Sequence, residues 1–304
     1  MPKAGKASLV RQIQEALEGR LAIGESKHLA KQNGTANEGI YSWNTFKTYM
    51  KHANYFASYC KQEHGSKTLS DCRQYVDKWL ESRSNLSPYT QKLEASALAK
   101  VYGCSTKDFI QTATRNRDDI TRSRGDKTRD AHFSEEKNRD FVDFCKGTGL
   151  RRSELAQLTG DKLVYRDGKP FIFVSEGTKG GRARYSPITG EKAKIEQMMR
   201  SAGTNKVFDH IPNGADVHGY RADYATAIYN ENARDLETCK KSPFYNPEHS
   251  NGKGHAKGGY DRDSVYHMRG THKGEWLDKQ AMEIASEALG HNRISVVGEH
   301  YIRS

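Results

Sequence analysis

The chain has no stretch that approaches the roughly 18 consecutive apolar residues of a membrane-spanning helix, and its start, MPKAGKASLVRQIQ, lacks the apolar segment of a signal peptide. Cysteine is also scarce. The five cysteines are odd in number, widely spaced and without a C-x-x-C pair. These absences argue against a membrane protein and against a secreted domain held by disulfides. We therefore expect a cytoplasmic protein with no membrane partner.

Basic residues outnumber acidic ones. The chain has 49 Lys and Arg against 38 Asp and Glu, a formal net charge of +11. This balance favours a polyanionic partner, because cations that neutralise phosphates release counterions. Ribosomal and membrane-surface proteins can be equally basic, so charge alone does not select the partner. A length of 304 residues is enough for two domains, each with a core of its own.

The first third of the sequence has the apolar spacing of helices. Apolar residues recur every three or four positions from Trp43 to Cys60, from Cys72 to Leu80 and from Tyr89 to Val101. Another helix is expected over residues 8–20, and Ser87-Pro88 predicts the start of the third pattern. Residues 1–112 therefore predict an all-helical domain whose aromatic side chains form its core.

Residues 113–131 alternate arginine with aspartate and hold almost no large apolar side chain. This composition predicts an exposed basic linker, and a strap across a DNA backbone is equally consistent with it. The next helix is expected to have Ser134 as its N-cap and to stop at Gly147, followed by a helix from about Arg151.

Three short strands are predicted between residues 162 and 187. KLVYR and PFIFVS are separated by an Asp167-Gly168 turn, and a turn at 179–181 leads into ARYSPI. The predicted fold class is therefore mostly α with a small antiparallel β-sheet in the C-terminal domain (α+β). That domain is expected to span 132–304.

Five motifs follow one another in the second half of the chain. They are TGLRRSEL at 148–155, TKGG at 178–181, ADVHGYRADYA at 215–225, LGH at 289–291, and a tyrosine ten residues after His291. Each is weak alone, but the ordered set of Arg, Lys, His-x-x-Arg, His and Tyr resembles the tyrosine recombinase (phage integrase) family. The motifs cover 132–301, and residues 1–110 match only in helical character. The resemblance implies a SAM-like core-binding domain and a catalytic domain that close as a C-shaped clamp on DNA.

The resemblance also implies the site residues. A tyrosine hydroxyl has a pKa of about 10 in peptides, so as a nucleophile it needs cationic neighbours. Planar guanidinium groups suit the oxygens of a phosphodiester. In the family pattern, Arg151 and Arg221 bind the phosphate and Tyr301 attacks it. Lys179 protonates the leaving group, and His218 and His291 contact the phosphate or assist proton transfer. Glu154 orients these groups. Arg152 is expected at the surface or on the DNA backbone.

A second candidate exists for the second arginine motif. Tyr266-His267-Met268-Arg269 ends 22 residues before His291, whereas Arg221 lies 70 residues before it. We prefer Arg221, because His218 would project from the same face of a helix capped near Asp216. This choice implies an insertion at about 232–277.

The insertion is rich in potential metal ligands: Cys239, His249, His255, His267 and His272. With one cysteine, and only His267 and His272 at a ligand-like spacing, a zinc site is the weaker interpretation. A basic loop or hairpin that touches DNA is the preferred one.

The implied reaction is DNA cleavage by Tyr301, which leaves a 3′-phosphotyrosine and a free 5′ hydroxyl, followed by rejoining without metal, ATP or another cofactor. The implied partner is double-stranded DNA at attachment sites, on which the chain would form a homotetramer. An accessory excision factor is a possible further partner. The implied location is the bacterial cytoplasm or nucleoid. The implied role is integration or excision of a mobile element. A Xer-like resolvase, a type IB topoisomerase-like strand transferase and a catalytically silent DNA-binding protein are alternatives.

Two features of the termini bear on partners. A modest basic contact to DNA is expected from Lys3, Lys6, Arg11 and Arg20. Only three residues follow Tyr301, where many relatives use a longer tail to dock on a neighbouring protomer, so the sequence leaves the mode of docking open.

Overall fold

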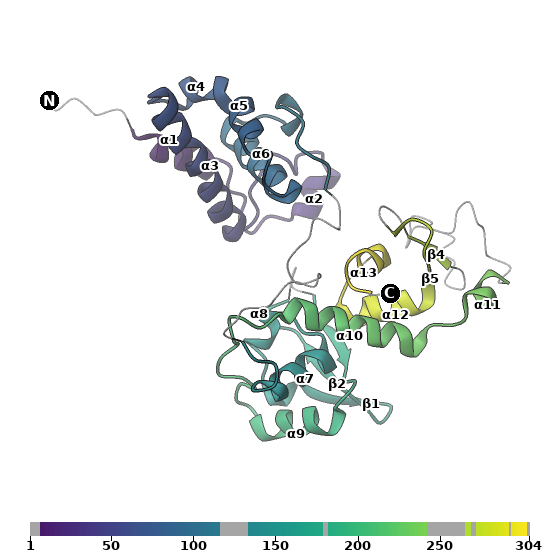
Figure 1. The fold of residues 1–304 in the computed structure, drawn as a ribbon. Helices are drawn as coiled ribbons and strands as arrows, with labels where there is room; N and C mark the ends of the chain where they lie inside the picture. Colours follow the sequence, from purple (N-terminus) through teal and green to yellow (C-terminus); the bar gives the residue numbers. More distant parts are fainter. Residues whose placement is uncertain are drawn as a thin grey trace. The chain divides into compact units, whose positions relative to one another are not determined.

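The computed structural model describes residues 7–115, 133–178, 182–241, 265–268, 272–291 and 293–302. The chain forms two compact units, Met1–Asp119 and Ile120–Ser304 (Figure 1). Most of the expected linker, 116–131, lies outside the described residues. Over the described ranges, no helix has the length and apolar character needed to cross a bilayer.

The first unit is helical, as its sequence pattern predicts (Figure 1). Its elements are α1 Leu9–Glu18, α2 Lys27–Gln32, α3 Trp43–His64, α4 Leu69–Cys72, the 3-10 turn η1 Arg73–Tyr75, α5 Val76–Ser82, α6 Pro88–Tyr102 and η2 Thr106–Asp108. The hydroxyls of Ser42 and Ser87 cap α3 and α6. The short helix α2 was not predicted, because its sequence has no apolar face and the helix buries no residue.

Aromatic residues fill the core of this unit, as expected. Phe56 and Trp79 are buried and meet edge to face at 5.3 Å between ring centroids. Trp43 departs from the prediction, because its side chain is 56% exposed. It is the first residue of α3, and the fully buried positions of this helix begin only at Ala53. The apolar stripe of α3 is therefore shorter than its sequence indicates.

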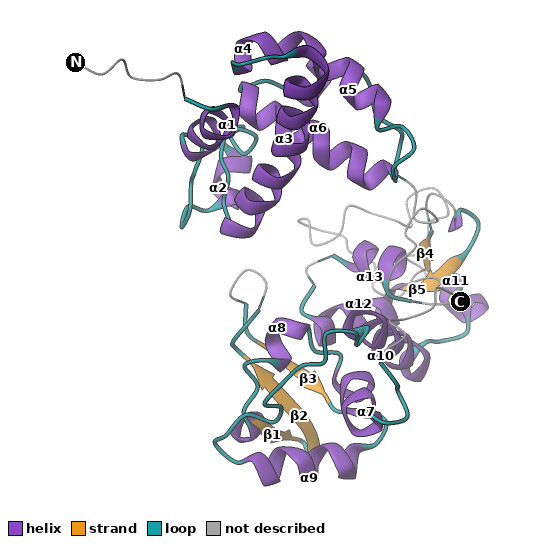
Figure 2. Ribbon diagram, turned by 60° about the vertical axis from the view of Figure 1, so that its left-hand side comes forward, coloured by secondary structure: helices purple, strands orange, loops and turns teal. Residues whose placement is uncertain are grey.

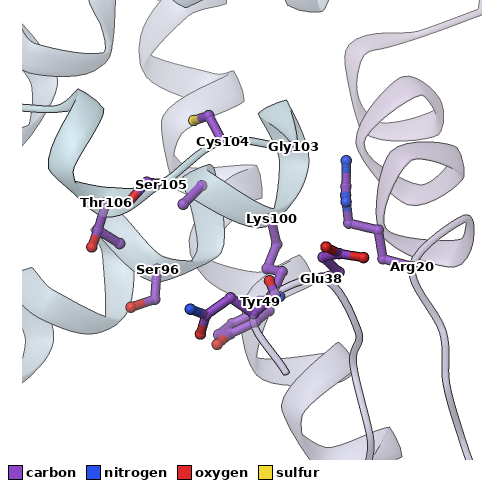
Figure 3. A pocket seen from close by; sticks show the side chains of 11 residues that line it. Arg20, Glu38, Tyr49, Ser96, Lys100, Gly103, Cys104, Ser105 and Thr106 are labelled. Atoms are coloured by element: carbon purple, nitrogen blue, oxygen red, sulfur yellow. The ribbon is translucent and has the colours of Figure 1, made fainter. Parts of the chain in front are cut away.

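A polar pocket of about 430 Å³ lies against α6 in the same unit (Figure 3). Arg20 and Lys100 line it together with Glu38, and the Lys100 ammonium donates to the carbonyl of Asn37. Burial lowers the pKa of Lys100, and the charge of Arg20 lowers it further. Of the other residues expected to touch DNA here, Arg11 is paired with Glu15 at 2.7 Å, and Lys3 and Lys6 lie outside the described residues.

The second unit combines helices with a three-stranded antiparallel sheet of order β1-β2-β3 (Figure 2). Its elements are α7 Arg139–Thr148, α8 Arg152–Leu155, η4 Gly160–Lys162, β1 Leu163–Arg166, β2 Lys169–Val174, β3 Arg184–Pro187, α9 Lys192–Ala202, α10 Val217–Asn232, α11 Leu236–Lys240, β4 Val265–His267, β5 Trp276–Asp278, α12 Lys279–Leu289 and α13 Ile294–His300. The predicted turn between β1 and β2 is present, with positive φ at Asp167 and Gly168. The predicted fold class is confirmed.

Helix α7 corrects two expectations. It begins at Arg139, and the Ser134 hydroxyl instead accepts from the Lys137 amide in a preceding turn. It also runs through Gly147 and ends at Gly149, which has φ of 61°. A Cβ atom on Gly147 would lie 2.3 Å from Ile195 Cδ1, so this glycine permits close packing and does not stop the helix.

Two apolar cores meet along α10. Its first turns, including Tyr220, pack in a core with the sheet, α7 and α9. Its later turns, from Ala222 to Tyr229, pack in a core with α12 and α13. Helices α10 and α12 lie side by side (Figures 1 and 2). His218 and Arg221 therefore lie on the helix that connects the two halves of this unit.

The expected insertion at 232–277 is described only in part, because residues 242–264 and 269–271 lie outside the described ranges. Its described parts include α11 and β4, and β4 pairs antiparallel with β5 from Val265↔Asp278 to His267↔Trp276. No group of three metal-ligating side chains occurs within the described residues. Of the potential zinc ligands, His249 and His255 lie outside them.

Candidate functional site

Tyr301 is the residue around which the predicted site assembles. It follows α13, its backbone amide donates to Val297 O at 2.8 Å, and its side chain is buried at 6% exposure. The His218 ring lies 5.2 Å from the Tyr301 ring and the His291 ring lies 5.1 Å from it, between centroids. Two histidines that are 73 positions apart in the sequence (291 minus 218) thus lie beside one phenol.

Arg221 completes this aromatic group with a cation. Its guanidinium carbon lies 5.6 Å from the centroid of the Tyr301 ring. Its Nη1 donates to Gly149 O and its Nη2 to Leu289 O at 2.5 Å, while its Nε has no hydrogen-bond partner in the described part of the chain. Burial lowers the pKa of Arg221 to about 10, with the charge of Arg151 adding to the effect, so the group stays protonated at neutral pH.

Helix α10 presents His218 and Arg221 as predicted. The Asp216 side chain accepts from the Gly219 amide and caps the helix. A spacing of three residues puts both side chains on one face. Gly149 allows α10 to pack closely: it caps α7 with φ of 61°, and a Cβ atom there would lie 2.2 Å from the Tyr224 ring.

Glu154 lies at the centre of an arginine cluster. Its buried carboxylate accepts from the Arg151 amide at 2.7 Å and from Arg151 Nη1 at 2.6 Å. Arg184 donates to both of its oxygens, at 2.7 and 2.8 Å. Burial alone would raise the pKa of Glu154, but the hydrogen bonds and charge of Arg184, with those of Arg151, lower it to about 2. The carboxylate is therefore ionised at every physiological pH.

His291 is placed by the end of α12. Gly290 ends this helix with φ of 68°, a conformation that disfavours side chains. The His291 amide then donates to Ser286 O at 2.8 Å, and the Ser286 hydroxyl donates to His291 O at 3.2 Å. These bonds fix the backbone from which the imidazole reaches Tyr301.

The structure brings together Arg151, Glu154, His218, Arg221, His291 and Tyr301 among the predicted residues. Lys179 lies outside the described residues, in the segment between β2 and β3. Arg269 of the rival motif also lies outside them, and its neighbour Tyr266 is buried in the α10–α12 core. The position beside Tyr301 is occupied by Arg221.

Arg152 corrects an expectation. The sequence places it at the surface or on DNA, but the side chain is partly buried and donates to main-chain carbonyls. Its Nη1 donates to Ile211 O at 3.2 Å and to Pro212 O at 2.9 Å, and its Nη2 donates to Ala215 O at 2.8 Å. Arg152 therefore ties the segment before α10 to α8.

Arg184 is the one buried cation of this cluster that sequence reasoning missed. The strand prediction ARYSPI contained it, and in a strand its side chain points inward with that of Ser186, while Tyr185 between them is exposed. Alternation puts Arg184 and Ser186 on one face, but both are polar, so the strand pattern gave no signal that this face is buried. Nothing in the motif pattern marked its charge as part of the site.

The arrangement has the electrostatics of an anion site. The guanidinium groups of Arg151 and Arg184 pair with the carboxylate of Glu154, and Arg221 interacts with all three charges. Three cations against this one carboxylate leave an excess of positive charge beside Tyr301. Bidentate guanidinium donors suit the geometry of carboxylates and phosphates, and a phosphodiester is one such anion. A phenol with cations and imidazoles around it can attack such a phosphorus and form an ester.

Matches to known proteins are found among solved structures. No protein-family model matches the chain, and a search of curated proteins finds no match. Among solved structures, it is similar to the Tn1549 transposon integrase in complex with circular intermediate DNA (12% identity, 98% of this chain, 96% of that chain, TM-score 0.46). It is also similar to the XerH site-specific recombinase bound to difH substrate (13% identity, 96% of this chain, 91% of that chain, TM-score 0.47).

Proposed function

We propose that the chain is a tyrosine-type DNA recombinase that cleaves and rejoins DNA strands through Tyr301. The convergence of His218, Arg221 and His291 on this phenol carries the proposal. His218 and Arg221 lie on α10, His291 follows α12 and Tyr301 follows α13, and the order of the sequence motifs selected them as one set. A terminal tyrosine that served only as packing would not require a buried arginine and two imidazoles around its ring.

In the proposed reaction, the Tyr301 hydroxyl oxygen attacks the scissile phosphorus. The new P–O bond to tyrosine forms as the bond to the 5′ oxygen breaks, and the phenol proton passes to a neighbouring base. Arg151 and Arg221 bind the non-bridging oxygens and stabilise the charge that grows in the transition state. Lys179 is the proposed acid that protonates the departing 5′ oxygen. Attack by a 5′ hydroxyl on the phosphotyrosine reverses the step and rejoins the strands.

The partner proposed for this site is double-stranded DNA. The net charge of +11 and the arginine cluster favour a phosphate polyanion. A homotetramer on two DNA sites, with an accessory excision factor, and the integration or excision of a mobile element are the finer parts of the proposal. They rest on the motif resemblance.

The test is covalent capture on nicked duplexes drawn from the DNA that flanks the gene. A nick beside the scissile phosphate lets the short product diffuse away, so the protein–DNA ester accumulates on a denaturing gel. Wild type should form an adduct and Tyr301→Phe should form none. Tyr165→Phe changes an exposed tyrosine of the same unit and is the matched control, expected to react like wild type. An adduct that persists in Tyr301→Phe would overturn the proposal.

A further inference from the structure

Arg184 is a buried cation outside the five motifs that defined the site. It is the first residue of β3 and is 7% exposed. A buried guanidinium is costly unless its donors are bound, so the fold has to supply specific acceptors for it. Those acceptors belong to the two segments that carry Arg151 and His291.

The first acceptor is the carboxylate of Glu154. Arg184 Nη1 and Nη2 donate to its two oxygens in a bidentate pair. The same carboxylate accepts from the amide and from Nη1 of Arg151. Arg184 and Arg151 are therefore held against one group, and movement of the carboxylate would move both guanidiniums.

The second acceptor lies at the end of α12. Arg184 Nε donates to Ala288 O at 3.0 Å, two residues before the capping Gly290. Contact continues at the cap itself, because a Cβ atom on Gly290 would lie 2.7 Å from Arg184 Cδ. Ser186, the next inward residue of β3, also donates to Ala288 O, at 3.3 Å. This strand thus contacts the turn from which His291 leaves the helix.

We infer that Arg184 is a positioning residue that fixes Arg151 and His291 relative to one another across the site. The inference rests on the proposed function. Each nitrogen of its guanidinium donates to an acceptor within the protein and the side chain is buried, so Arg184 acts through its neighbours. A lysine carries the same charge but lacks the planar fork that spans two carboxylate oxygens and a carbonyl.

A matched control exists in the same unit. Arg234 donates to both oxygens of Asp278, whose side chain is fully buried, at 2.7 and 2.9 Å. Truncating either arginine leaves a buried carboxylate without its bidentate partner. Of these two pairs, Arg184–Glu154 contacts Arg151 and the end of α12 before His291, and within the described residues Arg234–Asp278 does not contact Arg151. Arg184→Met and Arg184→Lys are therefore compared with Arg234→Met and Arg234→Lys.

Three quantities are measured for each variant: the melting temperature, the Kd for the nicked duplex, and the single-turnover rate of adduct formation at saturating duplex. Arg184→Met should slow the adduct step by about 100-fold with little change in Kd, since displacement of a catalytic group by about 1 Å costs that much. Arg184→Lys should recover part of the rate. The Arg234 variants should lower the melting temperature similarly and keep the wild-type rate. Equal losses of rate in both series would overturn the inference.

A second measurement works without catalysis. The imidazole resonances of His291 in isotope-labelled protein should shift in Arg184→Met and stay unchanged in Arg234→Met. If wild type forms no adduct, the proposed function fails, and this spectrum alone decides the positioning role: an unchanged His291 signal in Arg184→Met contradicts it.

A double variant guards against misfolding. If Arg184→Met does not fold, Glu154→Gln with Arg184→Gln replaces the ion pair by two neutral amides. Because the action of Arg184 on Arg151 passes through Glu154, the double variant should lose less rate than the sum of the losses in Glu154→Gln and Arg184→Gln alone. Additive losses in rate would show that Arg184 acts by another route.

Discussion

The guanidinium of Arg221 faces the ring of Tyr301 at 5.6 Å, and the same guanidinium is held by carbonyls of Gly149 and Leu289. Gly149 caps α7 and Leu289 is the last residue of α12, and these two helix ends lead into the Arg151 and His291 segments. One arginine thus joins three of the five sequence motifs beside the proposed nucleophile.

Replacing Arg221 by lysine tests this junction. A lysine keeps the charge but cannot bond both carbonyls and a phosphate, so adduct formation should fall by about 100-fold or more. Arg200→Lys changes an exposed arginine of the same unit and should react like wild type. The single-turnover rate on the nicked duplex measures the effect. A rate within a few-fold of wild type would place the phosphate clamp elsewhere.

Glu154 should make the stability of the second unit sensitive to acid. Its pKa is about 2 in the folded protein, against an ordinary value of 4.5. A lowered folded-state pKa adds stability above pH 4.5, and this stability is lost as the pH falls from 4.5 towards 2. Urea unfolding of wild type and Glu154→Gln between pH 6 and pH 3 checks the effect. The two curves should approach one another on acidification, whereas Glu15→Gln, an exposed control, should track wild type. A constant difference would contradict the assignment.

A comparison of Gly149 with Gly190 separates the cost of backbone strain from the cost of a side-chain clash. Gly149→Ala adds both, since φ is 61° and the new Cβ atom would lie 2.2 Å from the Tyr224 ring. Gly190→Ala adds strain alone, because φ is 60° and the space is open. We expect a loss of about 1 kcal/mol in unfolding free energy for Gly190→Ala and about 1 to 3 kcal/mol more for Gly149→Ala. Equal losses in urea unfolding would argue against the close packing of α10 on Gly149.

Arg152 tests whether a motif arginine can be purely structural. Arg152→Met removes the bonds to Ile211, Pro212 and Ala215 carbonyls and should lower the melting temperature. The slope of log K against log salt for binding to duplex DNA should stay as in wild type, because no phosphate contact is lost. A slope smaller by about one would show that Arg152 contacts DNA.

Much of this architecture follows from sequence because its signals are local. Asp216 caps the helix that it was expected to cap, Ser87-Pro88 begins the helix that it predicts, and the Asp167-Gly168 turn joins the strands that it predicts. Arg184 and Gly147 were misjudged or missed because their roles depend on groups distant in the sequence. The strand prediction contained Arg184, but it showed neither that this side chain is buried nor that Glu154 and Ala288 accept its hydrogen bonds.

The local sequence also misleads where the role of a residue depends on tertiary packing. Arg152 is of a type usually found at the surface, but it donates to the carbonyls before α10. Gly147 is of a type that often ends a helix, but here it allows Ile195 to pack closely. In both cases the deciding neighbours lie more than 40 residues away.

The most direct test of the central claim is to identify the amino acid that becomes linked to DNA. Adduct formed on the nicked duplex is digested with protease and nuclease, and the peptide that retains a nucleotide is sequenced by mass spectrometry. The account predicts one modified peptide, with the nucleotide ester on Tyr301. An ester on any other residue would contradict it.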